Sequence, residues 1–457
     1  MPRNTEMAEE KERKKPRRRF KVLYVFLIIL FVFIGLYCLY RYRLKSLLAS
    51  RIDEIRAAGF PATCQELDEW YSIPEDVNNA ADILMDAFLL YIEWNDTNNP
   101  LPVIGEGKIP GRSEQFSAKN LELIAEHLEK NKKYFELLHK GINIQHCRYP
   151  VDLRMVSGFV MPQLRELRTA ARNLQLEVYW YAEQDQTEAA LNSIEAIFKL
   201  ADTLSKEPTM VSQLVQIALK GLAISTIERV SNRTEFTEPQ LIRLQEILSK
   251  AIDADMMYYG FVGERCFYVS IYQDGRKALF DSYYGTNRFW DLVFIPYYIS
   301  GLAEQDTIIL ADVMTKCIEA LKLPEEERLR KVQTIEAKVD ELSRIHILAH
   351  MLVPAASRCV ILELRMNANL DAALIATTVQ RYRLANGVYP DTLTQLIPNY
   401  LDEIPADPFD GNDIRYKQLN PGFVVYSIGE DLVDNGGLER DPNSRSEEYD
   451  NPFIIEH

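Results

Sequence analysis

The sequence predicts a mainly α-helical protein with an N-terminal transmembrane helix, a body of helical hairpins and a small C-terminal α+β module. Three observations carry this prediction: an uncharged apolar run near the N-terminus, apolar stripes with helical spacing in the middle, and two short alternating segments near the end. The chain has 457 residues, of which 47% are hydrophobic and 26% charged. That length and balance are typical of a folded protein with more than one structural region.

The predicted membrane segment covers residues 22–40, which read VLYVFLIILFVFIGLYCLY and contain no charged side chain. A helix of this length spans about 28 Å, close to the thickness of the hydrocarbon layer. Backbone polar groups inside lipid must be satisfied within the segment, so we expect a helix whose partner is the lipid bilayer. A cleaved signal peptide is the alternative, but its apolar core is usually shorter and small residues follow it, whereas Tyr40–Arg43 follow here.

Charge is distributed unevenly along the chain. Residues 1–21 carry nine Lys and Arg against four Asp and Glu, whereas the whole chain has a net charge of −15. Because basic residues favour the cytoplasmic side of a membrane, we expect 1–21 to be a basic cytoplasmic head and the remainder to lie outside. The acidic remainder would repel phosphate groups, which argues against nucleic acid as a partner.

Residues 44–355 show apolar positions every three or four residues, as expected for helices that bury one face. Asp185 offers an N-cap for one helix, and Thr237 with Gln240 forms a capping box for another. We therefore predict a helical extracytoplasmic domain built from antiparallel hairpins. One of its stripes is formed by Leu164, Leu167, Ala171, Leu174, Val178 and Tyr181.

Fourteen aromatic residues lie between 258 and 298. Flat rings give large contact areas at low entropic cost, so this region could line a groove for a glycan or a peptide, with Tyr268, Tyr272 and Trp290 as candidate binding residues. A thick aromatic core between helices is the alternative interpretation.

The C-terminal module is predicted over 356–437, followed by a polar tail over 438–457. Its first helix should end at Asn386-Gly387, since glycine favours the left-handed conformation after a helix. A short helix is expected over 391–401. Two strands should then cover 414–418 and 423–428, with the turn Asn420-Pro421-Gly422 between them.

Several motifs of this module, in order, resemble the globular domain of the type II secretion major pseudopilin. They are YRLANGVYP, TLTQLIPNYL, IPADPFDG, IRY and VVYSIGEDLVDNGG. The resemblance covers about 70 residues and implies a calcium site in the acidic loop after the last strand, formed by Asp431, Asp434, Asn435 and Asp441. Oxygen ligands on a turn that contains glycine suit Ca²⁺. In that family a cleaved leader ends in Gly before Phe, whereas Arg19-Phe20-Lys21 stands at the entry to the apolar segment here. About 330 residues also lie between the membrane segment and the module, and both differences argue against polymerisation into a filament.

The whole chain also resembles membrane-anchored bacterial proteins of planctomycete type, a group without an assigned activity. The stretch IRAAGFPATCQELDEWY near the membrane segment and the pseudopilin-like end carry this resemblance. It implies a single-pass protein of the bacterial inner membrane, with its bulk in the periplasm.

Nucleotide-binding glycine loops, the H-E-x-x-H zinc motif and the G-x-S-x-G nucleophile motif are absent from the sequence. We therefore expect a non-enzymatic protein that serves protein–protein interaction or assembly in the cell envelope, with a role related to secretion as one form of this function. Two alternatives remain open: a glycan- or peptide-binding module that uses the aromatic region, and a hydrolase with an unrecognised acidic site.

Overall fold

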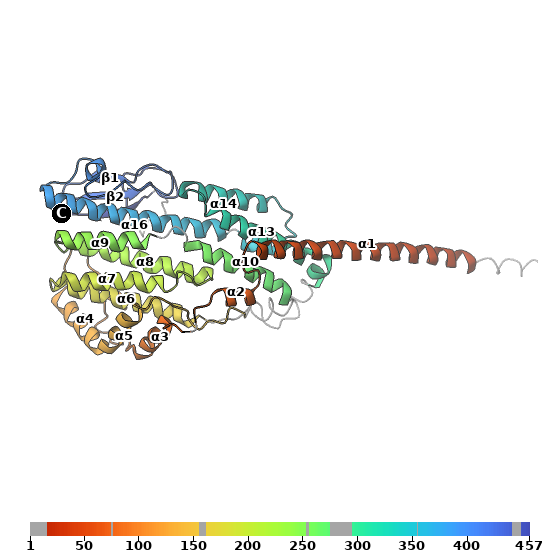
Figure 1. Cartoon of the computed structure of the whole chain (residues 1–457), viewed down its shortest axis with the longest axis horizontal. Helices are drawn as coiled ribbons and strands as arrows, with labels where there is room; N and C mark the ends of the chain where they lie inside the picture. The colour runs from red at the N-terminus through yellow and green to blue at the C-terminus, as the bar shows by residue number, and fades with distance from the viewer. Residues whose placement is uncertain are drawn as a thin grey trace, which may run out of the picture.

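The computed structural model describes residues 16–74, 76–154, 161–252, 256–274, 295–353, 355–440 and 449–457. Within these ranges the protein is mainly helical and carries one small three-stranded sheet near its C-terminus, as the sequence predicts (Figure 1).

The helices are α1 (Pro16–Ala57), α2 (Cys64–Trp70), α3 (Ala80–Leu90), α4 (Ala118–Lys130), α5 (Lys132–Gly141), α6 (Pro162–Glu183), α7 (Thr187–Asp202), α8 (Met210–Ser231), α9 (Glu238–Ala251), α10 (Met256–Asp274), α13 (Leu302–Ala320), α14 (Glu325–Asp340), α15 (Ile347–Leu352) and α16 (Ala355–Asn386). A 3₁₀ turn, η1 (Leu393–Leu396), follows, and the strands are β1 (Arg415–Gln418), β2 (Phe423–Ser427) and β3 (Asn451–Ile455).

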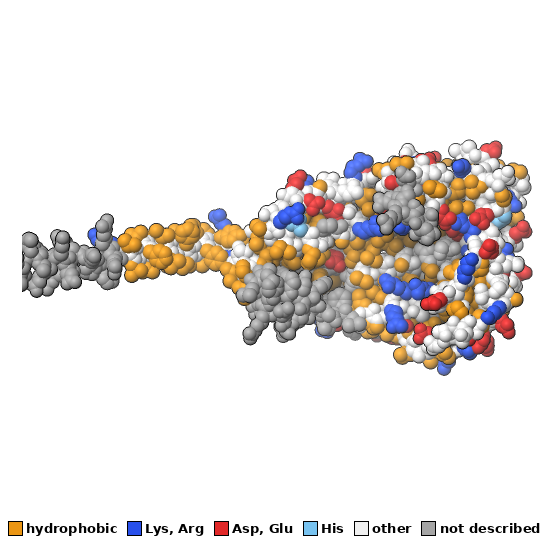
Figure 2. Space-filling model, turned by 180° about the vertical axis from the view of Figure 1, so that it is seen from behind, with side chains coloured by type: hydrophobic (Ala, Val, Ile, Leu, Met, Phe, Trp, Pro, Cys, Tyr) orange, Lys and Arg blue, Asp and Glu red, His pale blue; other side chains and the backbone are white. Residues whose placement is uncertain are grey.

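Helix α1 projects from the body as a long rod (Figure 1). Apolar side chains of 22–40 are exposed around it, and Figure 2 shows them covering the rod. The same helix continues beyond residue 40 and packs against α13, where Leu48 and Ile52 are buried. The predicted membrane segment is therefore one part of a longer continuous helix that enters the body without a linker.

The body has a single large core. Helices α6, α7 and α8 pack against one another, α10 packs against α13 and α8, and α16 packs against α8, α9 and α14. One cluster of buried apolar residues runs from Leu67 near α2 to Ile455 in β3. The region predicted as a separate C-terminal module thus shares its core with the helical body through α16.

The sheet has the order β1-β2-β3, with both pairs antiparallel. The first two strands lie within one residue of their predicted bounds, and the helix before them ends at Asn386 with Gly387 at φ +79°. The predicted polar tail 438–457 contains the third strand, β3, whose Phe453 and Ile455 are buried. Polar groups of α8 bind this strand: Ile454 N donates to Glu228 at 2.8 Å, and Asn232 Nδ2 donates to Ile454 O at 2.8 Å.

Two local predictions have different outcomes. The capping box of Thr237 and Gln240 is present at the start of α9. Asp185 is not an N-cap, because its backbone adopts φ +56° and Gln186 precedes the first turn of α7. The left-handed Asp185 instead closes the short connection between α6 and α7.

Three helical segments among the described residues are long and apolar enough to cross a membrane: Lys21–Ala57, Met210–Ser231 and Ile347–Asn386. The apolar window of the first is fully exposed, whereas 61% and 41% of the other two windows is buried in the body.

Candidate functional site

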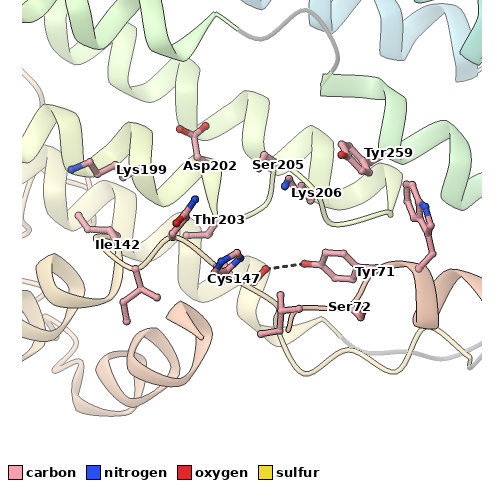
Figure 3. Close-up of a pocket in the computed structure, with 15 residues that line it drawn as sticks. Tyr71, Ser72, Ile142, Cys147, Lys199, Asp202, Thr203, Ser205, Lys206 and Tyr259 are labelled. Atoms are coloured by element: carbon pink, nitrogen blue, oxygen red, sulfur yellow. Dashed lines mark hydrogen bonds between the residues drawn. The ribbon is translucent and has the colours of Figure 1, made fainter. Parts of the chain in front are cut away.

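A pocket of about 520 Å³ lies between α2, the loop after α5, the end of α7 and the first turns of α10 (Figure 3). Lys199 lies at one end of the pocket and Tyr259 at the other, with Lys206 between them (Figure 3). The pocket is lined by Trp70, Tyr71, Ser72, Ile73, Ile142, Ile144, Gln145, His146, Cys147, Lys199, Asp202, Thr203, Ser205, Lys206 and Tyr259.

Aromatic rings form one wall of the pocket. The rings of Trp70 and Tyr259 have centroids 5.6 Å apart and are tilted by 39°, and Trp70 retains 37% of its surface exposed. Trp70 is the last residue of α2 and Tyr259 lies in the first turn of α10, so two distant chain segments build this wall. Such a ring pair offers an apolar surface on which a planar or apolar group of a ligand can stack.

Two lysines and one aspartate, Lys199, Lys206 and Asp202, also line the pocket. Lys206 is exposed and forms no ion pair with a described residue, while Lys199 pairs with Glu195 at 2.9 Å. Asp202 lies between them, 3.5 Å from the ammonium group of Lys220, whose side chain is 1% exposed. The buried Lys220 offsets part of the charge of Asp202, so Lys206 is the cation available to a ligand.

Arg148 holds the two loops that shape the pocket. Its guanidinium donates to Asp68 Oδ1 at 2.7 Å and to backbone carbonyls of Asp68 and Tyr71, and it lies over the Tyr71 ring at 5.2 Å. Asn79 in turn receives Arg148 N at 2.9 Å and donates to Arg148 O at 2.9 Å. The pocket is therefore pre-formed, with its aromatic end fixed by an ion pair and four further hydrogen bonds.

The thiol in the pocket is unsuited to nucleophilic catalysis. Burial raises the pKa of Cys147 to about 12, so it stays protonated at neutral pH. The hydroxyl of Thr203 donates to Leu200 O at 2.7 Å and lies 3.0 Å from Tyr149 Oη. Neither the Cys147 thiol nor the Thr203 hydroxyl is therefore placed as an activated nucleophile.

A second, more open cleft of about 760 Å³ lies between α4, α5, α6 and α7 and contains His139, Glu177 and Ser193. His139 Nε2 lies 2.9 Å from Glu177 Oε2, and Ser193 Oγ donates to the same oxygen at 2.7 Å. Because the hydroxyl bonds the carboxylate and not the imidazole, these three residues do not form a nucleophile–base pair.

Burial raises the pKa of several carboxyl groups outside both clefts, among them Glu207, Glu228 and Asp371. The pKa of Glu207 and that of Glu228 rise to about 7, and that of Asp371 rises to about 8, with nearby negative charges of Glu325 and Asp407 contributing to the last. Glu207 accepts from Ser212 at 2.6 Å, and Glu228 accepts from β3. None of the three lines the pocket, so they do not supply it with the paired carboxylates that the hydrolase alternative requires.

Two of the predicted aromatic binding residues, Tyr268 and Tyr272, do not line the pocket. Tyr268 is 6% exposed and belongs to the core, and Tyr272 donates to Glu304 at 2.9 Å near α1. Trp290 lies outside the described residues. Of the aromatic residues of α10, only Tyr259 lines the pocket.

The predicted calcium ligands Asp431, Asp434 and Asn435 lie in the loop after β2. Asp431 accepts from Val433 N at 3.0 Å and from Asn435 Nδ2 at 3.1 Å, while Asp434 accepts from Tyr426 Oη at 3.0 Å and Gly436 N at 2.9 Å. Asp441 lies outside the described residues. No group of three or more acidic, histidine or cysteine side chains suited to a metal occurs within the described part of the chain.

Comparisons with protein-family models, with curated proteins and with solved structures return no match for this chain.

Proposed function

We propose that the chain is a single-pass protein of the bacterial inner membrane, with residues 1–21 in the cytoplasm, whose periplasmic body binds a protein partner in the cell envelope. The observation that carries this proposal is helix α1. Its apolar side chains are exposed over 22–40 and the helix then enters the body unbroken. The excess of basic residues in 1–21 supports the orientation.

Buried charged residues within the other two apolar helices support the proposal that only α1 spans the membrane. Helix α8 contains Lys220 and Arg229, both buried by packing within the body, and α16 contains the buried Glu363 and Asp371. A charged side chain at the centre of a bilayer costs free energy. In the body, these four side chains instead lie among polar partners or are kept neutral by burial.

We further propose that the pocket receives an extended peptide segment that bears an acidic group. Lys206 would attract the carboxylate, and the Trp70–Tyr259 pair would contact the neighbouring apolar side chain. An aromatic anchor with a nearby charge is typical of surfaces that recognise protein segments. The pseudopilin-like motifs around the sheet support a role in assembly, including secretion, and a calcium ion in the acidic loop remains part of this proposal.

Photo-crosslinking in cells tests the pocket. Benzoylphenylalanine at Ile73, on the pocket wall, should capture a discrete protein partner, and the same residue at the exposed Leu89 of α3 should not. Lys206→Glu should abolish capture at Ile73, whereas Lys140→Glu, which changes a lysine outside the pocket by the same charge, should preserve it. Capture that is insensitive to Lys206→Glu would contradict the proposal. A periplasmic reporter fused after His457 tests the orientation, and activity only in the cytoplasm would overturn it.

A glycan is the second candidate ligand, because the tilted Trp70–Tyr259 pair could stack on a sugar ring. Trp70→Ala would then abolish binding of a neutral glycan, while Lys206→Glu would leave it unchanged. That pattern would replace the peptide proposal.

A further inference from the structure

Residues 295–300 form a short helical segment at the end of the body from which α1 projects (Figure 1). Tyr37 Oη donates to Ile299 O at 2.6 Å. Gln305 Nε2 donates to Tyr40 Oη at 2.6 Å. The segment thus lies against the part of α1 where the apolar run ends.

The position of Tyr37 gives the depth of this segment. Tyr37 precedes the end of the apolar run at Tyr40 by three residues, or about 4.5 Å along a helix. If the bilayer covers 22–40, the carbonyl group of Ile299, which Tyr37 contacts, lies within the depth of the bilayer and not above its surface. This step rests on the membrane anchor of the proposed function.

The side of the segment away from the body is apolar and exposed. Ile295 and Ile299 are 39% and 58% exposed, and their spacing of four residues places them on one helix face. The opposite face is fixed to the body, because Tyr297 is buried and donates to Asp306 at 2.6 Å. Two exposed isoleucines on one face, next to a helix that exposes apolar side chains all around, form a continuous apolar surface.

Charges at this level are arranged to tolerate lipid. Arg41, the first charged residue after the apolar run, is paired with Glu304, whose side chain is 1% exposed. Arg43 and Lys45, two and four residues beyond Arg41, are exposed, as expected for side chains that reach the phosphate layer.

We propose that residues 295–300 are a second membrane contact, inserted into the outer leaflet of the inner membrane at the level of the glycerol and upper acyl chains. The bilayer, and not a protein, is the occupant because this surface continues the lipid-facing surface of α1. The body then meets the membrane at two points, which fixes its tilt as well as its distance from the bilayer.

The test uses the full-length protein in nanodiscs of phosphatidylcholine and phosphatidylglycerol. In a Cys38→Ser background, which removes the exposed native thiol, single cysteines replace Leu30, Leu89, Ile295 or Ile299 and carry an environment-sensitive fluorophore. Fluorescence is quenched by lipids with a spin label near the glycerol or near the chain end, and by iodide in the water. The background protein without an added cysteine gives the signal from the remaining thiols.

We expect the Ile295 and Ile299 probes to be quenched by the shallow lipid label and protected from iodide. The Leu30 probe should be quenched by the deep label, and the Leu89 probe, at a side chain 84% exposed in α3, should respond to iodide alone. If Leu30 lies in lipid but both isoleucine positions respond to iodide, the second contact is refuted and the anchor stands. If Leu30 itself responds to iodide, the anchor fails and the inference fails with it.

Discussion

The ion pair between α1 and the body allows a test of whether α1 is attached rigidly or flexibly. Glu304 receives Arg41 Nη1 at 2.8 Å and a second, shorter bond from Arg41 Nη2, and it also receives the Tyr272 hydroxyl at 2.9 Å. The side chains of Glu304 and Arg41 are 1% and 19% exposed. Replacing Arg41 by Met keeps an unbranched apolar side chain similar to the aliphatic part of arginine and removes the charge, so a buried carboxylate loses its cation.

Removing one partner of a buried ion pair typically costs 3–5 kcal/mol. Arg41 keeps some access to water and Tyr272 continues to bond Glu304, so we expect Arg41→Met to lower the free energy of unfolding by about 3 kcal/mol. The double variant Arg41→Met/Glu304→Gln removes both charges and should lose much less than the sum of the single variants, with a coupling energy of about 2 kcal/mol.

Denaturant unfolding of the full chain in detergent micelles, followed by tryptophan fluorescence, measures these values. Arg51→Met provides a matched control on the same helix, because the pair Arg51–Glu54 is 40% and 57% exposed and should contribute about 0.5 kcal/mol. If Arg41→Met costs no more than Arg51→Met, or if the two changes at the junction are additive, the junction is not a buried clamp.

Three further predictions follow from the structure. Gly301→Ala should lower the free energy of unfolding by at least about 1 kcal/mol, because Gly301 has φ +89° and an added Cβ would lie 2.8 Å from a side chain of α1. Gly35→Ala is the control: an added Cβ there has no atom within 4 Å and should have no cost in the same unfolding assay. Burial raises the pKa of Asp371 from 3.8 to about 8 in the folded state, so the folded protein keeps this proton and its free energy of unfolding falls as pH rises from about 4 to 8. Asp371→Asn should reduce the dependence of the unfolding free energy on pH by up to about 1.4 kcal/mol per pH unit, measured by denaturation at a series of pH values. An unchanged pH dependence would refute this role of Asp371. If the acidic loop binds calcium, added Ca²⁺ should raise the Tm of the full chain relative to chelator, and Asp431→Ala/Asp434→Ala should abolish the rise; a rise that persists in the double variant would place the ion elsewhere.

Local signals account for the parts of the fold that the sequence predicts well. The capping box at Thr237 and the turn at Asn420-Pro421-Gly422 depend on neighbouring residues alone, and both lie where expected. Strand β3 could not be found this way. Its five residues contain a proline, and they become a strand because β2 offers a free edge and because Glu228 and Asn232, more than 220 residues earlier, bind its backbone.

The pocket, like strand β3, could not be predicted from local sequence. Trp70, Lys206 and Tyr259 come from three separate segments, and no motif links them in the sequence. The aromatic density around 258–298 pointed to part of the pocket, but the neighbours of Tyr259 on α10 are used mainly in packing: Tyr268 lies in the core. A residue count cannot separate the one ring that faces a cavity from those that fill an interior.

One helix, α10, joins the junction between α1 and the body to the pocket. Tyr272, near the end of α10, bonds Glu304 at the junction, and Tyr259, near its start, lines the pocket. Tyr272 follows Tyr259 by thirteen positions, which corresponds to about 20 Å along the helix. Since α10 also packs against α8 and α13, the pocket cannot swing on a flexible tether as it would if a loop followed the anchor. With α1 in a bilayer, the pocket would be held at a fixed position relative to the membrane surface. Such a geometry would favour a partner that is itself confined near the same bilayer, because a fixed pocket gains effective concentration only for a ligand held within its reach.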